Sequence, residues 1–172
     1  MRRVPPPFPA LPVLLGLALC LGLSACGYSL ASRGPSALKD NQRKLYLVSV
    51  ENPSLDTWVG PELRSRLRDE INNRHVARWT ERSNAQGLVE VVIDRFTTSE
   101  TTVTGESDQS LRYAASISVS MHIVSPLDGS VLWSSGSVGA SESFYGKDAA
   151  SARERVVRLA VERMVDRLSE NY

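Results

Sequence analysis

Residues 112–124 read RYAASISVSMHIV, the most regular alternation of apolar and small polar residues in the chain. Successive side chains of a strand point to opposite faces of its sheet, so this pattern predicts a strand with one apolar and one polar face. The apolar face carries Tyr113, Ala115, Ile117, Val119, Met121 and Ile123. The opposite face carries Arg112, Ala114, Ser116, Ser118, Ser120 and His122. We expect that polar face either to be solvated or to meet a partner.

Two further elements are predicted on the C-terminal side of this strand. The turn Pro126-Leu127-Asp128-Gly129 combines a proline, which fixes one backbone angle, with a glycine, which accepts a positive φ. A strand from Val131 to about Ser143 is expected next, and then a long helix over residues 147–169. The buried stripe predicted for that helix consists of Ala152, Val156, Leu159, Ala160, Met164 and Leu168.

Residues 88–98 are also predicted to form a strand, with apolar residues on both of its faces. These residues are Val89, Val91 and Ile93 on one face and Val92 and Phe96 on the other. Apolar residues on both faces favour a strand that is covered on both sides. The polar residues 99–110 are expected to connect this strand to residues 112–124.

The region before residue 88 predicts a strand followed by a helix. Residues 44–50 are rich in β-branched and aromatic side chains, and Asn52-Pro53 stops the strand that they predict. A helix is expected from Pro61 to about Asn73. Its apolar residues recur every four positions, at Leu63, Leu67 and Ile71. Residues 75–80 are either a short strand or an extended link.

The predicted elements follow the order β-α-β-β-β-α, which indicates an α+β fold. We expect a two-layer sandwich in which a mostly antiparallel, four-stranded sheet carries both helices on one face. Residues 44–172 would form this single domain, since the whole chain of 172 residues has room for one modest core. The formal net charge of +1 gives no global basic surface, which argues against nucleic acid as a partner.

Residues 1–25 are predicted to be a lipoprotein signal peptide. Arg2 and Arg3 provide a positive start, and residues 10–23 are apolar apart from small residues. As a helix, this apolar segment would span roughly 21 Å, which is short of the ~30 Å hydrocarbon core of a bilayer. Leu23-Ser24-Ala25-Cys26 resembles the bacterial lipobox at all four positions, and there the cysteine sulfur receives diacylglycerol before the peptide is cleaved.

This cleavage would make Cys26 the first residue of the mature chain. Cys20 would be removed and the Cys26 thiol acylated, so no disulfide is expected. Residues 26–43 would form the lipidated N-terminus and a tether. Several acyl chains, palmitate among them, would anchor the protein stably. Gly27 stands where an aspartate would favour inner-membrane retention, so we expect the outer membrane of a Gram-negative bacterium. The alternative is an ordinary secretory signal beside a buried free cysteine.

Few residues in the sequence suggest catalysis. His75 and His122 are the only histidines, and no Gly-x-Ser-x-Gly motif places a nucleophile on a strained turn. Two histidines without nearby cysteine or paired carboxylates make a poor metal site. We therefore expect a non-enzymatic protein without a metal or other cofactor, with both histidines at the surface. A lipid-anchored hydrolase is the alternative, and it predicts that His122→Ala would abolish activity.

Three basic residues are candidates for binding a phosphate group. Arg95, Arg112 and Lys147 are predicted to lie on strands or at a strand-to-helix junction, where the geometry is well fixed. The arginines between residues 64 and 82 are denser, but acidic residues interrupt them. A solvated helix face explains that denser group at least as well as a binding site.

Cys26-Gly27-Tyr28-Ser29-Leu30 resembles the mature start of the LptE family of lipopolysaccharide-assembly lipoproteins. The resemblance continues in residues 45–50 and Asn52, in Leu63 and Leu67, and in the layout of the whole mature chain. It implies a protein that plugs the lumen of the outer-membrane β-barrel LptD and assists its assembly. It also implies binding of lipopolysaccharide on its way to the cell surface, for which Arg95, Arg112 and Lys147 are the contact candidates.

A different periplasm-facing lipoprotein is the alternative within the binding proteins. An activator of a peptidoglycan synthase and an auxiliary subunit of a lipid transporter are two examples. Either would have partners that are soluble domains or inner-membrane proteins, whereas a plug would be recovered together with a β-barrel. The lipid anchor at Cys26 is expected in all of these cases, with the domain facing the periplasm or, for a plug, inside a barrel lumen.

Overall fold

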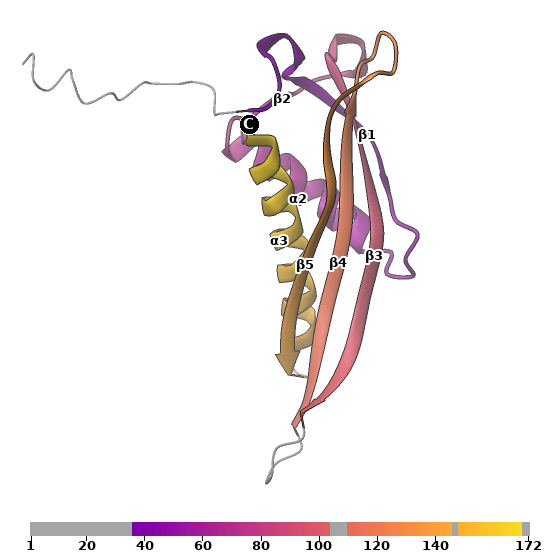
Figure 1. The fold of residues 1–172 in the computed structure, drawn as a ribbon, viewed down its shortest axis with the longest axis vertical. Helices are drawn as coiled ribbons and strands as arrows, with labels where there is room; N and C mark the ends of the chain where they lie inside the picture. The colour runs from indigo at the N-terminus through magenta and orange to yellow at the C-terminus, as the bar shows by residue number, and fades with distance from the viewer. Residues whose placement is uncertain (1–35, 104–109, 146–147, 170–172) are drawn as a thin grey trace, which may run out of the picture. The chain divides into compact units, whose positions relative to one another are not determined.

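The computed structural model describes residues 36–103, 110–145 and 148–169, which form a sheet and two long helices (Figure 1). All of these residues lie in one compact unit, residues 32–172. The elements are η1 (Asp40–Gln42), β1 (Lys44–Glu51), α2 (Val59–Asn73), β2 (Arg78–Trp79), η2 (Arg82–Asn84), β3 (Gly87–Val103), β4 (Ser110–Val124), β5 (Val131–Tyr145) and α3 (Ala149–Ser169).

The five described strands form one mixed sheet with the order β2-β1-β3-β4-β5. β1 is parallel to both of its neighbours, with Leu45 in register with Trp79 of β2 and with Gly87 of β3. The chain crosses over through α2 between β1 and β3, which is the kind of connection that parallel pairing requires. β3, β4 and β5 are antiparallel. The α+β prediction is confirmed, but the four-stranded, mostly antiparallel sheet is wrong in detail, because Arg78–Trp79 supply a fifth strand and both pairings of β1 are parallel.

A β-bulge in β3 moves Phe96 to the helix-covered side of the sheet. The register between β3 and β4 shifts between Ile93 and Arg95, so Asp94 is the extra residue. Ile93 and Phe96 are both buried, and the Phe96 ring lies edge-on to Trp58 with the ring centroids 5.6 Å apart. The assignment of Phe96 to the second face is therefore wrong, because the bulge places it on the same face as Ile93, whereas Val92 lies on the second face and is half-buried.

The hairpin of β3 and β4 is longer than the sequence predicts. β3 continues to Val103 and β4 begins at Ser110, so residues 99–103 and Ser110 pair as strand instead of forming a polar connection. Threonines fill much of this extension, and β-branched residues favour extended backbone even where they contribute no apolar surface. These extra residues continue the antiparallel ladder between β3 and β4.

Both helices pack on the same face of the sheet, as Figure 1 shows. The predicted apolar residues of α2, which are Leu63, Leu67 and Ile71, are all fully buried. On α3 the buried residues are Ala152, Val156, Val157, Ala160, Val161, Met164, Val165 and Leu168. Leu159 was predicted to be buried but is only partly so, because α3 also packs against α2 and its buried stripe turns toward that helix.

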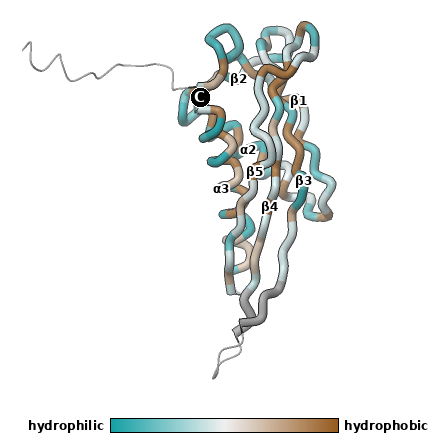
Figure 2. Tube along the Cα trace, viewed as in Figure 1, coloured by the Kyte–Doolittle hydropathy of each residue, from teal (hydrophilic) through white to brown (hydrophobic). Residues whose placement is uncertain are grey.

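The apolar side of β4 lies directly under the helices. Ala115, Ile117, Val119, Met121 and Ile123 are buried, as the alternating pattern predicts. Hydrophobic residues gather along β1, β3 and the inner sides of the helices (Figure 2). Within residues 36–103, 110–145 and 148–169, no helix combines the length and apolarity needed to cross a bilayer.

Candidate functional site

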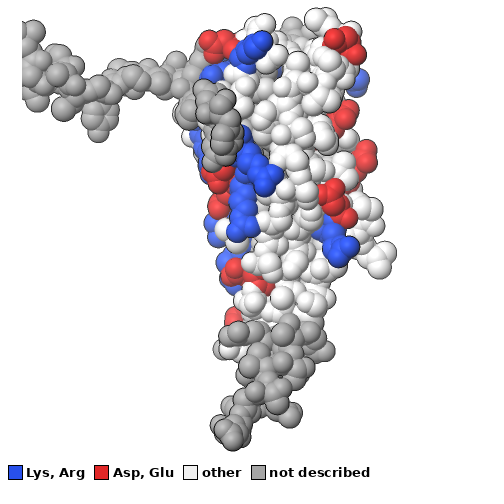
Figure 3. Space-filling view, viewed as in Figure 1, with Lys and Arg blue, Asp and Glu red and all other residues white. Residues whose placement is uncertain are grey.

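The face of the sheet turned away from the helices is lined by small hydroxyl side chains. We call it the hydroxyl face, and its members are Glu90, Asp94, Arg95 and Thr97 of β3, Ser116, Ser118, Ser120 and His122 of β4, and Ser134, Ser137, Ser141 and Ser143 of β5. Oγ of Ser116 lies 3.0 Å from Oγ of Ser141, and Oγ of Ser118 lies 2.9 Å from Oγ of Ser137. Figure 3 shows a broad surface over β3–β5 with few charged side chains.

Asp94 is the carboxylate that the bulge adds to the hydroxyl face. Oγ of Ser118 donates to Oδ2 of Asp94 at 3.2 Å, and Oγ of Ser120 donates to Oδ1 at 3.1 Å. Arg95 follows at once and is in register with Ser118, so both charged residues lie on the same side of the sheet. The bulge therefore places one negative and one positive side chain among the serines of the hydroxyl face, which also carries Glu90 and His122.

The free edge of β5 is covered in part by arginines from α3. Nη1 of Arg163 donates to the carbonyl oxygen of Gly139. Nη1 of Arg167 donates to the carbonyl oxygen of Ser135 and, at 3.1 Å, to that of Ser137. These carbonyls belong to β5, which is the last of the described strands in the sheet order. Long cationic side chains on an edge strand hinder pairing with another chain.

A cleft of about 660 Å³ opens between this edge and the last turns of α3. Its walls include Ala37, Trp133, Ser134, Val138, Arg163, Asp166 and Arg167. Arg155, Arg163 and Arg167 are spaced by multiples of four along α3, and Arg155 also reaches β5, with its Nε 3.0 Å from Oε1 of Glu142. This row is a basic cluster that sequence reasoning missed, although its four-residue spacing in the sequence could have signalled it.

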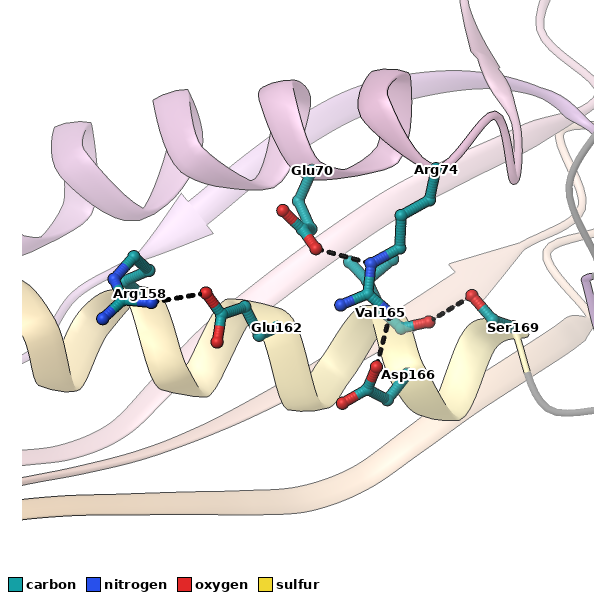
Figure 4. Close-up of polar contacts among 7 residues, drawn as sticks. All are labelled: Glu70, Arg74, Arg158, Glu162, Val165, Asp166 and Ser169. Carbon is teal, nitrogen blue, oxygen red and sulfur yellow. Dashed lines mark hydrogen bonds and ion pairs between the residues drawn. The ribbon is translucent and has the colours of Figure 1, made fainter.

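Arg74 joins the two helices at the end where α2 stops (Figure 4). Its Nε lies 2.5 Å from Oε1 of Glu70, and its Nη1 binds the carboxylate of Asp166 on α3. Burial lowers the pKa of Arg74, but hydrogen bonds and charge from Asp166 and Glu70 outweigh it, so the pKa lies above its usual value. Arg158 and Glu162 pair within α3 at 2.8 Å. Arg74 thus links α2 to α3, and both arginines hold carboxylates, which makes them less available to a ligand.

The structure separates the two predicted phosphate contacts that it describes, Arg95 and Arg112. Arg95 is exposed on β3. The backbone of Arg112 is in register with Thr101 and Tyr145, whereas Arg95 is in register with Ser118. Arg112 and Ser118 are six positions apart on β4, which corresponds to roughly 20 Å at about 3.3 Å per residue. Lys147 lies outside the described residues, as does the predicted lipidation site Cys26.

Neither histidine lies in a recognisable catalytic arrangement. His75 is exposed and has φ of 55°, and its backbone N–H bonds the carbonyl oxygen of Asn72, which is a common way to end a helix. His122 lies on the hydroxyl face, in register with Glu90 and Ser134. Over the described part of the chain, no cluster of three or more His, Cys, Asp or Glu side chains is placed to hold a metal ion.

The model of the family described as LptE, lipopolysaccharide-assembly, matches residues 42–168, which include both helices and nearly the whole sheet. The chain belongs to the LptE family. The family predicted from the resemblance is thereby confirmed, whereas residues 26–30 lie outside the matched region. Among curated proteins, none matches the sequence.

Solved structures with a similar fold include other bacterial lipoproteins. A minor lipoprotein from Acinetobacter baumannii is 11% identical, with a TM-score of 0.52 over 74% of this chain and 91% of that one. Lipoprotein GNA1162 from Neisseria meningitidis is 11% identical, with a TM-score of 0.51 over 74% of this chain and 99% of that one. PelC from Paraburkholderia phytofirmans, a dodecamer, is 15% identical, with a TM-score of 0.54 over 80% of this chain and 95% of that one. At these identities the LptE-family chain shares their fold alone.

Proposed function

We propose that this protein is an outer-membrane lipoprotein, acylated at Cys26, that occupies the lumen of the LptD barrel and assists its assembly. The family match over residues 42–168 carries this proposal. The hydroxyl face supports it, because the interior of a β-barrel is polar and a plug needs a polar surface that does not demand strong ion pairing. We assign the hydroxyl face as the surface that meets the barrel wall.

The same proposal includes binding of lipopolysaccharide as it passes to the cell surface. Arg95 is exposed on the hydroxyl face, where a guanidinium can make paired hydrogen bonds to a phosphate group. Arg112 and Lys147 remain proposed contacts alongside it. Because Arg95 and Arg112 are far apart along the ladder, we infer that they meet different phosphate groups or different molecules, not one group.

A photo-crosslinking amino acid at Ser137 tests which surface meets the barrel. The probe is placed in the full-length chain in cells, and the matched control carries it at Arg64, which is exposed on α2. We expect the Ser137 probe to form an adduct with a β-barrel and the Arg64 probe to form little or none. Adducts with an inner-membrane or peptidoglycan-synthesis protein would instead support the alternative lipoprotein functions.

Two substitutions test the anchor and the ligand separately. Cys26→Ala in the full chain is expected to move the protein out of the membrane fraction, and an unchanged fraction would refute acylation at this residue. Arg95→Ser is expected to weaken capture of purified lipopolysaccharide, whereas Arg64→Ser is not. His122→Ala is expected to leave membrane association and lipopolysaccharide capture intact. Loss of the protein's function in cells through His122→Ala would favour the hydrolase alternative.

A further inference from the structure

The turn between β4 and β5 projects an apolar side chain into solvent. Leu127 is 95% exposed, and Val131, the first residue of β5, is 63% exposed. Exposed leucines are common at protein surfaces and need no explanation by themselves. Leu127 differs from an ordinary exposed leucine in its position within the fold.

The turn holds Leu127 in a defined position. The backbone N–H of Leu127 donates to Oγ of Ser125 at 3.2 Å, and that of Gly129 donates to the carbonyl oxygen of Ser125 at 2.9 Å. Ser125 N–H in turn donates to the carbonyl oxygen of Ser130 at 2.8 Å. Gly129 has φ of 71°, which glycine adopts without strain. The leucine therefore extends from a hydrogen-bonded tip, not from a loose loop.

This tip lies at the end of the sheet where the described chain begins. Ala37 and Trp133, which is two positions after Val131, line the same cleft. Ala37 N–H also donates to the carbonyl oxygen of Leu168 near the end of α3. In Figure 1 the turn between β4 and β5 is at the same end of the sheet as η1 and η2. Residues entering from the proposed anchor thus meet the domain close to the Leu127 tip.

The chain between the anchor and the domain is short. Cys26 precedes Ser36, the first described residue, by ten positions, and even fully extended these span at most about 36 Å. Exposed Lys39, Lys44 and Arg82 lie at this end together with the exposed acidic residues Asp40, Glu81 and Asp128. A surface of mixed charge with basic residues present does not repel anionic lipid headgroups. The anchor therefore keeps this end of the domain near the bilayer.

We propose that Leu127, with Val131 beside it, inserts into the headgroup region of the bilayer that holds the acyl chains of Cys26. This inference rests on the proposed acylation of Cys26. The acyl chains supply the affinity, whereas the leucine fixes which end of the domain faces the lipid surface. The apolar tip binds a phospholipid bilayer, because the tether brings the bilayer surface within reach of Leu127.

Leu55 provides a matched control within the same chain. Its side chain is 99% exposed. Leu55 follows Glu51, the last residue of β1, whereas the tether joins the domain before the first residue of that strand. The length of β1, roughly 26 Å at about 3.3 Å per residue, therefore separates Leu55 from the tether. An environment-sensitive fluorophore is attached through Leu127→Cys or through Leu55→Cys in the mature, acylated full chain. Labelling is specific because Cys20 leaves with the signal peptide and the Cys26 thiol is acylated.

Both labelled chains are reconstituted into vesicles of phosphatidylethanolamine and phosphatidylglycerol. We expect a blue-shifted emission that spin-labelled lipids quench at position 127, and neither effect at position 55. With the probe at Val131→Cys, adding Leu127→Ser should remove the shift without lowering the thermal stability, since the Leu127 side chain is exposed.

The outcomes separate this inference from the anchor on which it rests. If neither chain floats with the vesicles, the acylation proposal fails and takes this inference with it. If the chains float but position 127 shows no shift, or both positions shift equally, the insertion of Leu127 is refuted and the anchor stands. A shift that occurs only when a β-barrel is co-reconstituted also refutes it, because the occupant is then protein.

Discussion

The two faces of β4 differ in almost every physical property although they alternate residue by residue along one strand. Val119 is fully buried under the helices, whereas its neighbour Ser118 faces outward and bonds Asp94 and Ser137. The covered face gains its free energy from removal of apolar surface from water. The hydroxyl face contributes little to folding. A surface that folding does not require is available for a partner. Substitutions on the covered face should therefore lower stability far more than substitutions on the hydroxyl face.

Val119→Ser should produce the largest effect, because it places a hydroxyl group on the covered face. Lost apolar contact and an unsatisfied buried hydroxyl are expected to cost about 2–4 kcal/mol of unfolding free energy. Urea denaturation followed by circular dichroism measures this change as a lower midpoint at an unchanged slope. Ser118→Ala is the matched control and should cost less than about 1 kcal/mol. Equal losses in the two variants would contradict the division between the faces.

Gly87→Ala tests how tightly the covered face is packed at its rim. A Cβ at this position would lie 2.8 Å from Cγ2 of Ile123 and 2.9 Å from Cδ2 of Leu45. Both neighbours are fully buried, so they cannot move into solvent, and overpacking is expected to cost about 1–3 kcal/mol. The melting temperature should fall while the far-ultraviolet spectrum keeps its shape. A variant as stable as the parent would show that the rim relaxes freely.

The covered face was largely predictable from the sequence, and its exceptions have local causes. The alternation in residues 112–124 and the four-residue repeat of Leu63, Leu67 and Ile71 both follow from regular backbone geometry. The bulge at Asp94 changes the phase of alternation without any signal from glycine or proline. A parallel strand of two residues, Arg78–Trp79, is too short for any period to reveal. Its pairing depends on β1, which is distant in sequence.

The candidate site was less predictable, because it depends on contacts between distant elements. The serine pattern was visible in the sequence, but Asp94 joins it only through the bulge. Arg163 and Arg167 reach β5 because α3 folds back along that strand, and the sequence shows only their spacing. Arg112 was correctly expected on the strand, whereas the separation between it and Arg95 required the register of the hairpin.

Arg74→Gln tests the layer of helices above the covered face. It removes the bonds to Glu70 and to Asp166, but about a third of the Arg74 side chain is exposed. Solvent screening at such positions limits the expected loss to about 0.5–1 kcal/mol. The difference between Arg74→Gln and the parent should shrink in high salt. Arg158→Gln, which breaks a pair within α3 alone, should cost about 0.3–0.5 kcal/mol. The larger loss in Arg158→Gln would contradict a linking role for Arg74.

Protonation of Asp128 should have the smallest effect on stability, because this residue lies in the turn between β4 and β5 and is fully exposed. Hydrogen bonds from Ser125 and Ser130 lower the pKa of its carboxyl group below the usual range. A lowered pKa means that the folded turn favours the ionised form. The contribution to stability is therefore present above the usual pKa of an aspartate and is lost as the pH falls through the folded value. Carboxyl-carbon NMR titration measures the pKa directly, and Ser130→Ala should move it back toward the usual range. A pKa of Asp128 at or above that range would show that the turn does not hold the carboxylate, and the defined position of Leu127 would lose one of its supports.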